Sequence, residues 1–204
     1  VCKGAGAYVG GGLSLRLRLL FVTLVAAIGA WWFYIKLGTD SILVPGFGVV
    51  HLGVWFIALF VAVILGLYSG GIIDGVDGLS GGVFSIMFAA YGIIALSEMQ
   101  FDLAAFCLAV VGGLLAFLWY NIPPARFFLS ETGSMGLTIT LGIVAFLSGH
   151  VLELGLIALP LIVTTLSSVI QLLSKKFRNG KRVFLVAPLH NHFQAKGWPP
   201  YKVT

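Results

Sequence analysis

Two carboxylates stand three residues apart in a glycine-rich segment, Gly70-Gly-Ile-Ile-Asp74-Gly-Val-Asp77-Gly-Leu-Ser-Gly-Gly82, between two long apolar runs. Glycine lets a backbone approach a ligand closely and adopt positive φ. Paired carboxylates can bind a divalent cation, share a proton, or act as base and electrostatic stabiliser. The alternative is that Asp74 and Asp77 are merely polar residues of a loop. Which interpretation holds depends on the other motifs of the chain.

A third carboxylate lies in Glu131-Thr-Gly-Ser134, which we interpret as a short polar turn leading into another apolar run. A carboxylate with hydroxyl and backbone N–H neighbours beside a helix start suits phosphate or metal–phosphate binding. The competing interpretation is a helix cap, in which Thr132 or Ser134 caps and Glu131 benefits from the helix dipole.

Two histidines, His190 and His192, follow a basic stretch that begins at Lys175. In an extended segment, residues two apart face the same way, so both imidazoles could contact phosphate, transfer a proton or contact a metal. A His-x-His pair alone is a weak signal, because surface histidines are common. The basic residues before it could equally be a collar at a membrane surface.

The elements that position these residues are apolar helices. The 204 residues are 59% hydrophobic and 9% charged, whereas a soluble domain is about 25% charged. Several of the six apolar runs approach the roughly 20 residues that span a bilayer as helix. They cover residues 19–34, 52–67, 79–96, 103–120, 135–147 and 151–173. The sequence therefore predicts an all-α, polytopic transmembrane bundle that forms one integral membrane domain over residues 1–204, with a tight turn at Gly149 and a kink at Pro160 in the sixth span.

Alternating spans place residues 1–18, 68–78, 121–134 and 174–204 in the cytoplasm. These segments hold 11 of the 12 Lys and Arg residues, with Lys36 outside, as the positive-inside rule requires. The carboxylates and histidines introduced above then share one membrane face. A transporter would carry ionisable residues near the middle of its spans. Here the spans are nearly free of charge, which favours an interfacial enzyme over a transporter.

Four motifs in this order resemble a known family. They are Asp74-Gly-Val-Asp77-Gly-Leu, Phe117-Leu-Trp-Tyr-Asn121, Glu131-Thr-Gly-Ser134 and Ala187-Pro-Leu-His190-Asn-His192-Phe-Gln-Ala-Lys-Gly-Trp198. Together they are similar to the polyprenyl-phosphate N-acetylhexosamine-1-phosphate transferases, and most similar to their phospho-N-acetylmuramoyl-pentapeptide transferase branch. The likeness covers essentially the whole chain.

The resemblance implies a Mg²⁺-dependent enzyme of peptidoglycan synthesis with about ten membrane helices, of which the six spans form the middle. Its substrates would be UDP-N-acetylmuramoyl-pentapeptide and undecaprenyl phosphate, and its products the lipid-linked sugar and UMP. It would lie in the bacterial inner membrane with its active site facing the cytoplasm, in contact with membrane lipid. We expect no nucleic-acid partner, and a homodimer remains an option.

The resemblance also implies roles for individual residues. Glu131 would bind Mg²⁺, while Asp74 and Asp77 would position the nucleotide or assist phosphoryl transfer. The remaining implied roles are uridine contacts for Asn121 and Phe128, phosphate contacts for His190 and His192, with His190 among the catalytic residues, and substrate binding for Lys3, which matches a family lysine.

This chain departs from the family pattern at three positions. The family has Asn where Gly71 stands, Asp where Glu131 stands and His where Asn191 stands. The longer glutamate shifts its oxygens by about 1 Å, and misplacement on that scale can cost on the order of 100-fold in rate. Two alternatives therefore stay open: a related N-acetylglucosamine-1-phosphate transferase, and a degenerate membrane protein that binds or transports a nucleotide sugar without catalysis.

We further expect the chain to be a fragment. The family's adjacent Asp-Asp pair would fall immediately upstream of Val1, and its final helix would follow Thr204. On this expectation the 204-residue chain alone is inactive.

Overall fold

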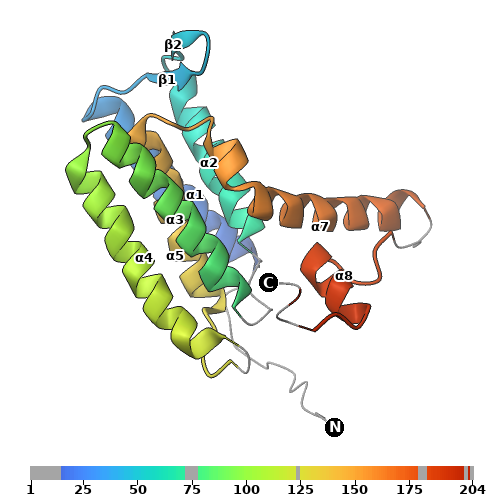
Figure 1. Ribbon diagram of the computed structural model, residues 1–204. Helices are drawn as coiled ribbons and strands as arrows, with labels where there is room; N and C mark the ends of the chain where they lie inside the picture. Colours follow the sequence, from blue (N-terminus) through green and yellow to red (C-terminus); the bar gives the residue numbers. More distant parts are fainter. Residues whose placement is uncertain (1–14, 72–77, 123–124, 179–182, 200–201, 203–204) are drawn as a thin grey trace.

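The computed structural model describes residues 15–71, 78–122, 125–178, 183–199 and 202, with only the backbone described at Leu15 and Glu131. Five helices form a bundle (Figure 1). They are α1 (Leu15–Ile35), α2 (Trp55–Gly70), α3 (Leu79–Ser97), α4 (Phe101–Asn121) and α5 (Ser130–Ser148). Each corresponds to one of the first five apolar runs, so uniform apolarity over a span's length predicted these helices well.

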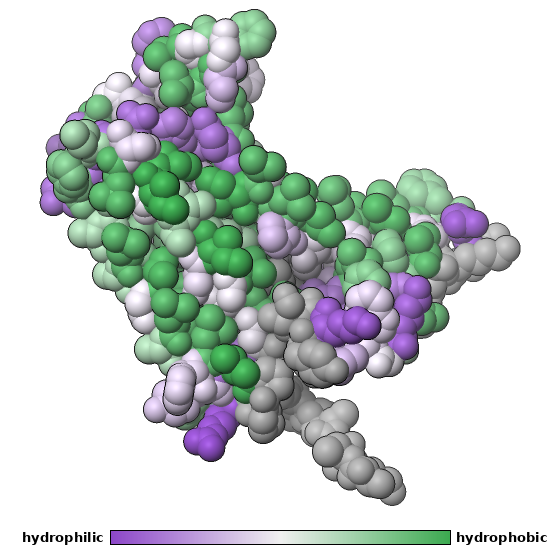
Figure 2. Space-filling model, in the orientation of Figure 1, coloured by the Kyte–Doolittle hydropathy of each residue, from purple (hydrophilic) through white to green (hydrophobic). Residues whose placement is uncertain are grey.

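Within the described residues, three helices are long and apolar enough to cross a membrane, by length and composition. They are Arg16–Ile35, Leu79–Ser97 and Phe101–Asn121, whereas Trp55–Gly70 and Thr132–Ser148 are shorter apolar helices. Figure 2 shows apolar residues over the middle of the molecule and hydrophilic residues gathered toward its ends and near α8. The predicted helical membrane bundle is therefore confirmed.

Aromatic packing holds one half of the bundle together. The rings of Phe33 on α1, Phe56 and Phe60 on α2 and Phe146 on α5 form a cluster in which Phe60 and Phe146 lie 4.4 Å apart between centroids. Tilted and edge-on arrangements of this kind are those that aromatic quadrupoles prefer. A second cluster, which includes the buried Tyr91, joins α3 to α4 and α5. The two clusters fix the helices of the bundle relative to one another. We call the end of the bundle formed by the last turns of α2 and α4 and the first turns of α3 and α5 the inner end.

The prediction of a single, kinked sixth span is wrong. Two helices replace it: α6 (Leu154–Ile157) and α7 (Leu159–Phe177), separated at Ala158. Pro160 falls in the first turn of α7, where its missing N–H costs nothing. The chain can therefore restart in a new direction, and α7 extends sideways from the bundle (Figure 1). The predicted turn before α6 is confirmed, since Gly149 ends α5 with φ of 79°.

Two smaller elements were not predicted. An antiparallel hairpin of β1 (Ser41–Val44) and β2 (Gly48–His51) joins α1 to α2. A short helix, α8 (Leu189–Ala195), carries the histidine motif below α7 in Figure 1.

Candidate active site at the inner end of the bundle

Asn121 ties together two of the sequence motifs. It is the last residue of α4 and is 1% exposed. Its Oδ1 accepts a 2.9 Å hydrogen bond from the backbone N–H of Gly78, and its Nδ2 donates one of 2.6 Å to the carbonyl of Phe127. The amide thus links the start of α3, next to Asp77 in the sequence, to the segment that carries Phe128. Both the oxygen and the nitrogen of the side-chain amide are therefore hydrogen-bonded to backbone groups of the protein.

Phe128 is exposed over 58% of its surface and is free to offer a ring face to a base. Its neighbour Phe127 packs edge-on against Tyr120, with centroids 5.7 Å apart. This contact and the Asn121 bond hold the segment in place. Asp74, Asp77 and Lys3 lie outside the described residues.

Glu131 lies in the first turn of α5 rather than in a polar turn before it, which corrects that prediction. The N-cap residue is Leu129, and it makes no side-chain cap hydrogen bond, so neither Thr132 nor Ser134 is the cap. Ser130, the first helical residue, has a φ of 61°, which a residue with a Cβ rarely adopts. One turn on, the buried Oγ of Ser134 has no hydrogen-bond partner among the described residues. A helix start with a carboxylate and an unsatisfied hydroxyl can bind a polar ligand or a metal–phosphate.

Gly71, one of the departures from the family pattern, has a packing explanation. A Cβ there would lie 3.1 Å from Cγ2 of Thr138 on α5 and 3.2 Å from the Tyr68 carbonyl. A side chain at this position would therefore require Thr138 or the Tyr68 carbonyl to shift by a few tenths of an ångström, because such contacts are tighter than most in packed proteins.

A row of buried polar side chains on α7 holds the histidine segment. Gln171 is 4% exposed, and its Oε1 accepts hydrogen bonds from the N–H groups of Val183 (3.1 Å) and Phe184 (3.0 Å). Its Nε2 donates to the Phe184 carbonyl at 2.9 Å. Ser167 Oγ, one turn earlier, accepts from the N–H of Leu189 at 3.1 Å. Both residues were missed in the sequence, although a polar row at helical spacing in an apolar helix is a visible signal.

The two histidines do not face the same way, contrary to the prediction from an extended segment. Residues 189–195 are helical, so neighbours two apart point to different sides. His190 is buried, and burial lowers its pKa below the ordinary 6.5 because the charged form loses solvation. His192 is half-buried, and its Nδ1 accepts a 3.1 Å hydrogen bond from the N–H of Leu185. In the neutral ring the proton then lies on Nε2, which can donate to a phosphate.

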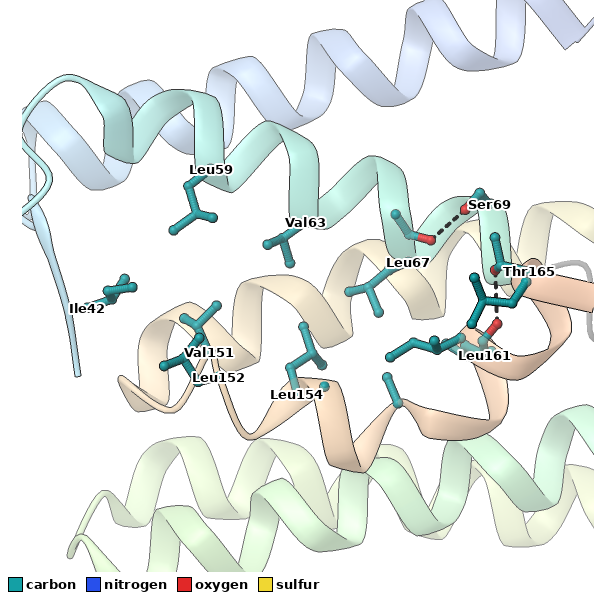
Figure 3. A pocket seen from close by; sticks show the side chains of 15 residues that line it. Ile42, Leu59, Val63, Leu67, Ser69, Val151, Leu152, Leu154, Leu161 and Thr165 are labelled. Carbon is teal, nitrogen blue, oxygen red and sulfur yellow. Dashed lines mark hydrogen bonds between the residues drawn. The ribbon is translucent and has the colours of Figure 1, made fainter. Parts of the chain in front are cut away.

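An apolar cavity of about 430 Å³ lies between α2 and the α6–α7 pair (Figure 3). Leu59, Val63 and Leu67 of α2 line it, facing Leu154 and Leu161. Its inner end is marked by Ser69 and Thr165, whose hydroxyls donate to carbonyls of their own helices. The next residue, Gly70, touches α7 so closely that a Cβ there would lie 2.8 Å from Leu161 Cβ. The cavity therefore ends where the chain leaves α2 toward Asp74.

The sequence profile described as glycosyl transferase family 4 matches residues 11–149, well over half of the chain. The chain belongs to this family. Similar curated proteins are the phospho-N-acetylmuramoyl-pentapeptide-transferases of Levilactobacillus brevis (42% identical; 88% of this chain and 56% of that protein) and Lactiplantibacillus plantarum (40%; 78% and 50%). That of Chloroflexus aggregans is 35% identical over 95% of this chain and 56% of its own length. The chain thus spans about half the length of the curated relatives that it matches.

Membership of glycosyl transferase family 4 agrees with the distribution of charge. Among the described residues, no Asp, Glu, Lys or Arg side chain is buried. The buried polar residues in the described part of the chain are instead Ser, Thr, Asn, Gln and His190. Among them, Asn121 at the end of α4 and Ser167 on α7 hold backbone near the motifs. The sequence motifs gather around helix ends, which is where an enzyme working at a membrane surface needs them.

Proposed function

We propose that the full-length protein transfers phospho-N-acetylmuramoyl-pentapeptide from its UDP carrier to undecaprenyl phosphate and releases UMP. The family and the names of the relatives support the class of reaction. The observation that supports a prenyl phosphate as the acceptor is the apolar cavity, which ends beside Gly70. A prenyl chain suits such a cavity, and its phosphate would then emerge at the polar, motif-bearing end of the bundle.

In this reaction a phosphate oxygen of the acceptor attacks the sugar-linked phosphorus, and the bond from that phosphorus to the UMP oxygen breaks. Charge moves onto the leaving UMP, so catalysis is mainly positioning and electrostatic stabilisation. We assign Asp74 and Asp77 to the positioning of the nucleotide and the transferring group. The Asn121 tether fixes the backbone beside Asp77. The exposed ring of Phe128 is assigned to uracil stacking.

His192 is assigned to a phosphate oxygen, because its Nε2 proton is directed away from the Leu185 bond that occupies Nδ1. His190 differs in role, since its lowered pKa keeps it neutral near pH 7. A neutral imidazole can accept or relay a proton. Lys3 is assigned to the donor phosphates through the family resemblance.

The residues present fit a magnesium ion. Mg²⁺ prefers hard oxygen ligands and uses only one or two carboxylates beside substrate phosphates. Glu131 and the unsatisfied hydroxyl of Ser134 lie one turn apart at the start of α5. Glu131 would hold the ion, which when bound would neutralise charge on the phosphates.

We also propose that the protein lies in the bacterial inner membrane with this site toward the cytoplasm. Cationic residues support that orientation because they gather at the same end as the motifs, including Arg16, Arg126 and Lys175. Among the described residues, Lys36 differs, because it follows the opposite end of α1 from Arg16.

The test measures Mg²⁺-dependent UMP release by the full-length protein in vesicles. Asp74→Asn and Glu131→Ala should abolish it, because each removes a carboxylate from the reacting end. Asp102→Asn is the matched control, since Asp102 lies in the first turn of α4 at the opposite end of that helix from Asn121. Undiminished release in both site variants would refute the assignment. Binding of the UDP donor to the wild-type protein by calorimetry without any UMP release would favour the degenerate, non-catalytic alternative.

A further inference from the structure

The apolar cavity between α2 and the α6–α7 pair is called the acceptor cavity, because we assign it to the prenyl acceptor. One end of it is formed by the hairpin rather than by a helix. Ile42 of β1 lines the cavity together with Leu59 of α2 and with Val151 and Leu152 before α6. Figure 3 places Ile42 at the opposite end from Ser69 and Thr165. From Leu59 to Ser69, α2 rises about 15 Å. The cavity therefore extends along much of α2, and Ile42 lies at the outer end of the cavity.

The hairpin presents two different faces, because successive residues of a strand point to opposite sides. Ile42 is half-buried and packs against the buried hydrophobic cluster that contains the four phenylalanines of α1, α2 and α5 together with Val151 and other apolar residues. Its neighbour Leu43, paired with Val49, is 38% exposed and does not line the cavity. The two adjacent apolar residues therefore differ in exposure and in contact with the cavity.

Several bonds hold the base of the hairpin in place. The Leu52 N–H donates to the Asp40 carbonyl at 2.7 Å, and His51 Nδ1 lies 3.1 Å from Asp40 Oδ1. Ser41 pairs with His51 in the ladder. A two-stranded hairpin alone is marginal in water, so these bonds and the packing of Ile42 are what fix its position.

We propose that Ile42 closes the outer end of the acceptor cavity and is a specificity-determining residue for the prenyl chain length. This rests on the proposed function, since it assumes that the acceptor's tail occupies the cavity. Isoprene units that fill the cavity reach Ile42, and any further units must leave it for the bilayer. A short chain never reaches Ile42. The side chain therefore acts on long acceptors only.

The kinetic test compares Ile42→Trp with Leu43→Trp in the full-length protein, using undecaprenyl phosphate and the short acceptor geranyl phosphate. The bulky residue at position 42 should lower kcat/KM for undecaprenyl phosphate by about tenfold. The values for geranyl phosphate and the KM for the UDP donor should not change. Leu43→Trp should leave all of them unchanged. Equal losses with both acceptors, or no loss at all, would overturn the proposal.

A binding test does not depend on turnover. Benzoylphenylalanine placed at position 42 should photo-crosslink undecaprenyl phosphate in a saturable way, and excess unlabelled undecaprenyl phosphate should compete. The same group at position 43 should crosslink bilayer lipid without such competition. Labelling at 42 that is no more competable than at 43 would refute the role of Ile42. Absence of UMP release by the wild-type protein would instead refute the proposed function. The crosslinking result would still show whether a prenyl phosphate binds next to position 42.

Discussion

At the residue scale, Asn121 is a motif residue whose side chain is bonded within the protein. The sequence predicted that it contacts uridine, and this contact stays a prediction. The structure adds that its amide is already bonded to Gly78 and Phe127. Its first effect is therefore on the position of the backbone beside Asp77 and Phe128.

Replacing Asn121 by Ala should destabilise the protein by about 1–3 kcal/mol, because the Gly78 N–H and the Phe127 carbonyl both lose their partner in a buried place. The measurement is unfolding of the purified protein in detergent, beside calorimetric titration with UDP. Wild-type stability with loss of UDP binding would contradict the tether and favour direct contact with the nucleotide.

His190 gives a prediction about pH. Burial lowers its pKa in the folded protein, whereas the unfolded chain has the ordinary value of 6.5. As the pH falls below about 6.5, the unfolded state binds the proton first, so the free energy of unfolding should fall until the folded pKa is reached. His190→Gln, which cannot titrate, should lose less stability over that range. Parallel pH profiles of wild type and variant in thermal unfolding would rule this out.

At the element scale, α7 has two functions that its apolar sequence did not reveal. Leu161 and Thr165 line the cavity, while Ser167 and Gln171 hold the histidine segment. Apolar length predicted α1 to α5 because those helices need only lipid or one another as neighbours. The role of Gln171 depends on backbone groups 12 and 13 residues further along the chain, which periodicity does not show. The hairpin was missed although Pro45-Gly46 between β-branched runs is a turn signal.

Gln171→Leu keeps the size of the side chain but removes its three hydrogen bonds to Val183 and Phe184. Amide hydrogen exchange at these two residues should accelerate by on the order of tenfold, since each lost bond contributes about 1 kcal/mol. The matched control is Leu172→Ala, at an exposed neighbour on the same helix. Unchanged exchange at Val183 and Phe184 in the Gln171 variant would show that the segment is held by other contacts.

At the scale of the whole molecule, the close approach of α2 and α7 joins the bundle to α7 and to the histidine segment that α7 holds. It depends on one residue without a side chain. At Gly70, a Cβ would lie 2.8 Å from Leu161 Cβ and 2.9 Å from the Leu161 carbonyl and from Thr165 Oγ1. One turn earlier, at Gly66, a Cβ would meet nothing within 4 Å. Two glycines of the same helix therefore have opposite structural roles.

Alanine at Gly66 and Gly70 should change stability in opposite directions. Gly66→Ala should be neutral or stabilising by up to about 1 kcal/mol, because alanine favours the helix and has room. Gly70→Ala should cost about 1–3 kcal/mol, since the added methyl forces α2 and α7 apart. Equal unfolding free energies for the two variants would mean that α7 is not held against α2 at this point. Ser167 and Gln171 would then fix the histidine segment to α7, but nothing at Gly70 would fix α7 to the bundle.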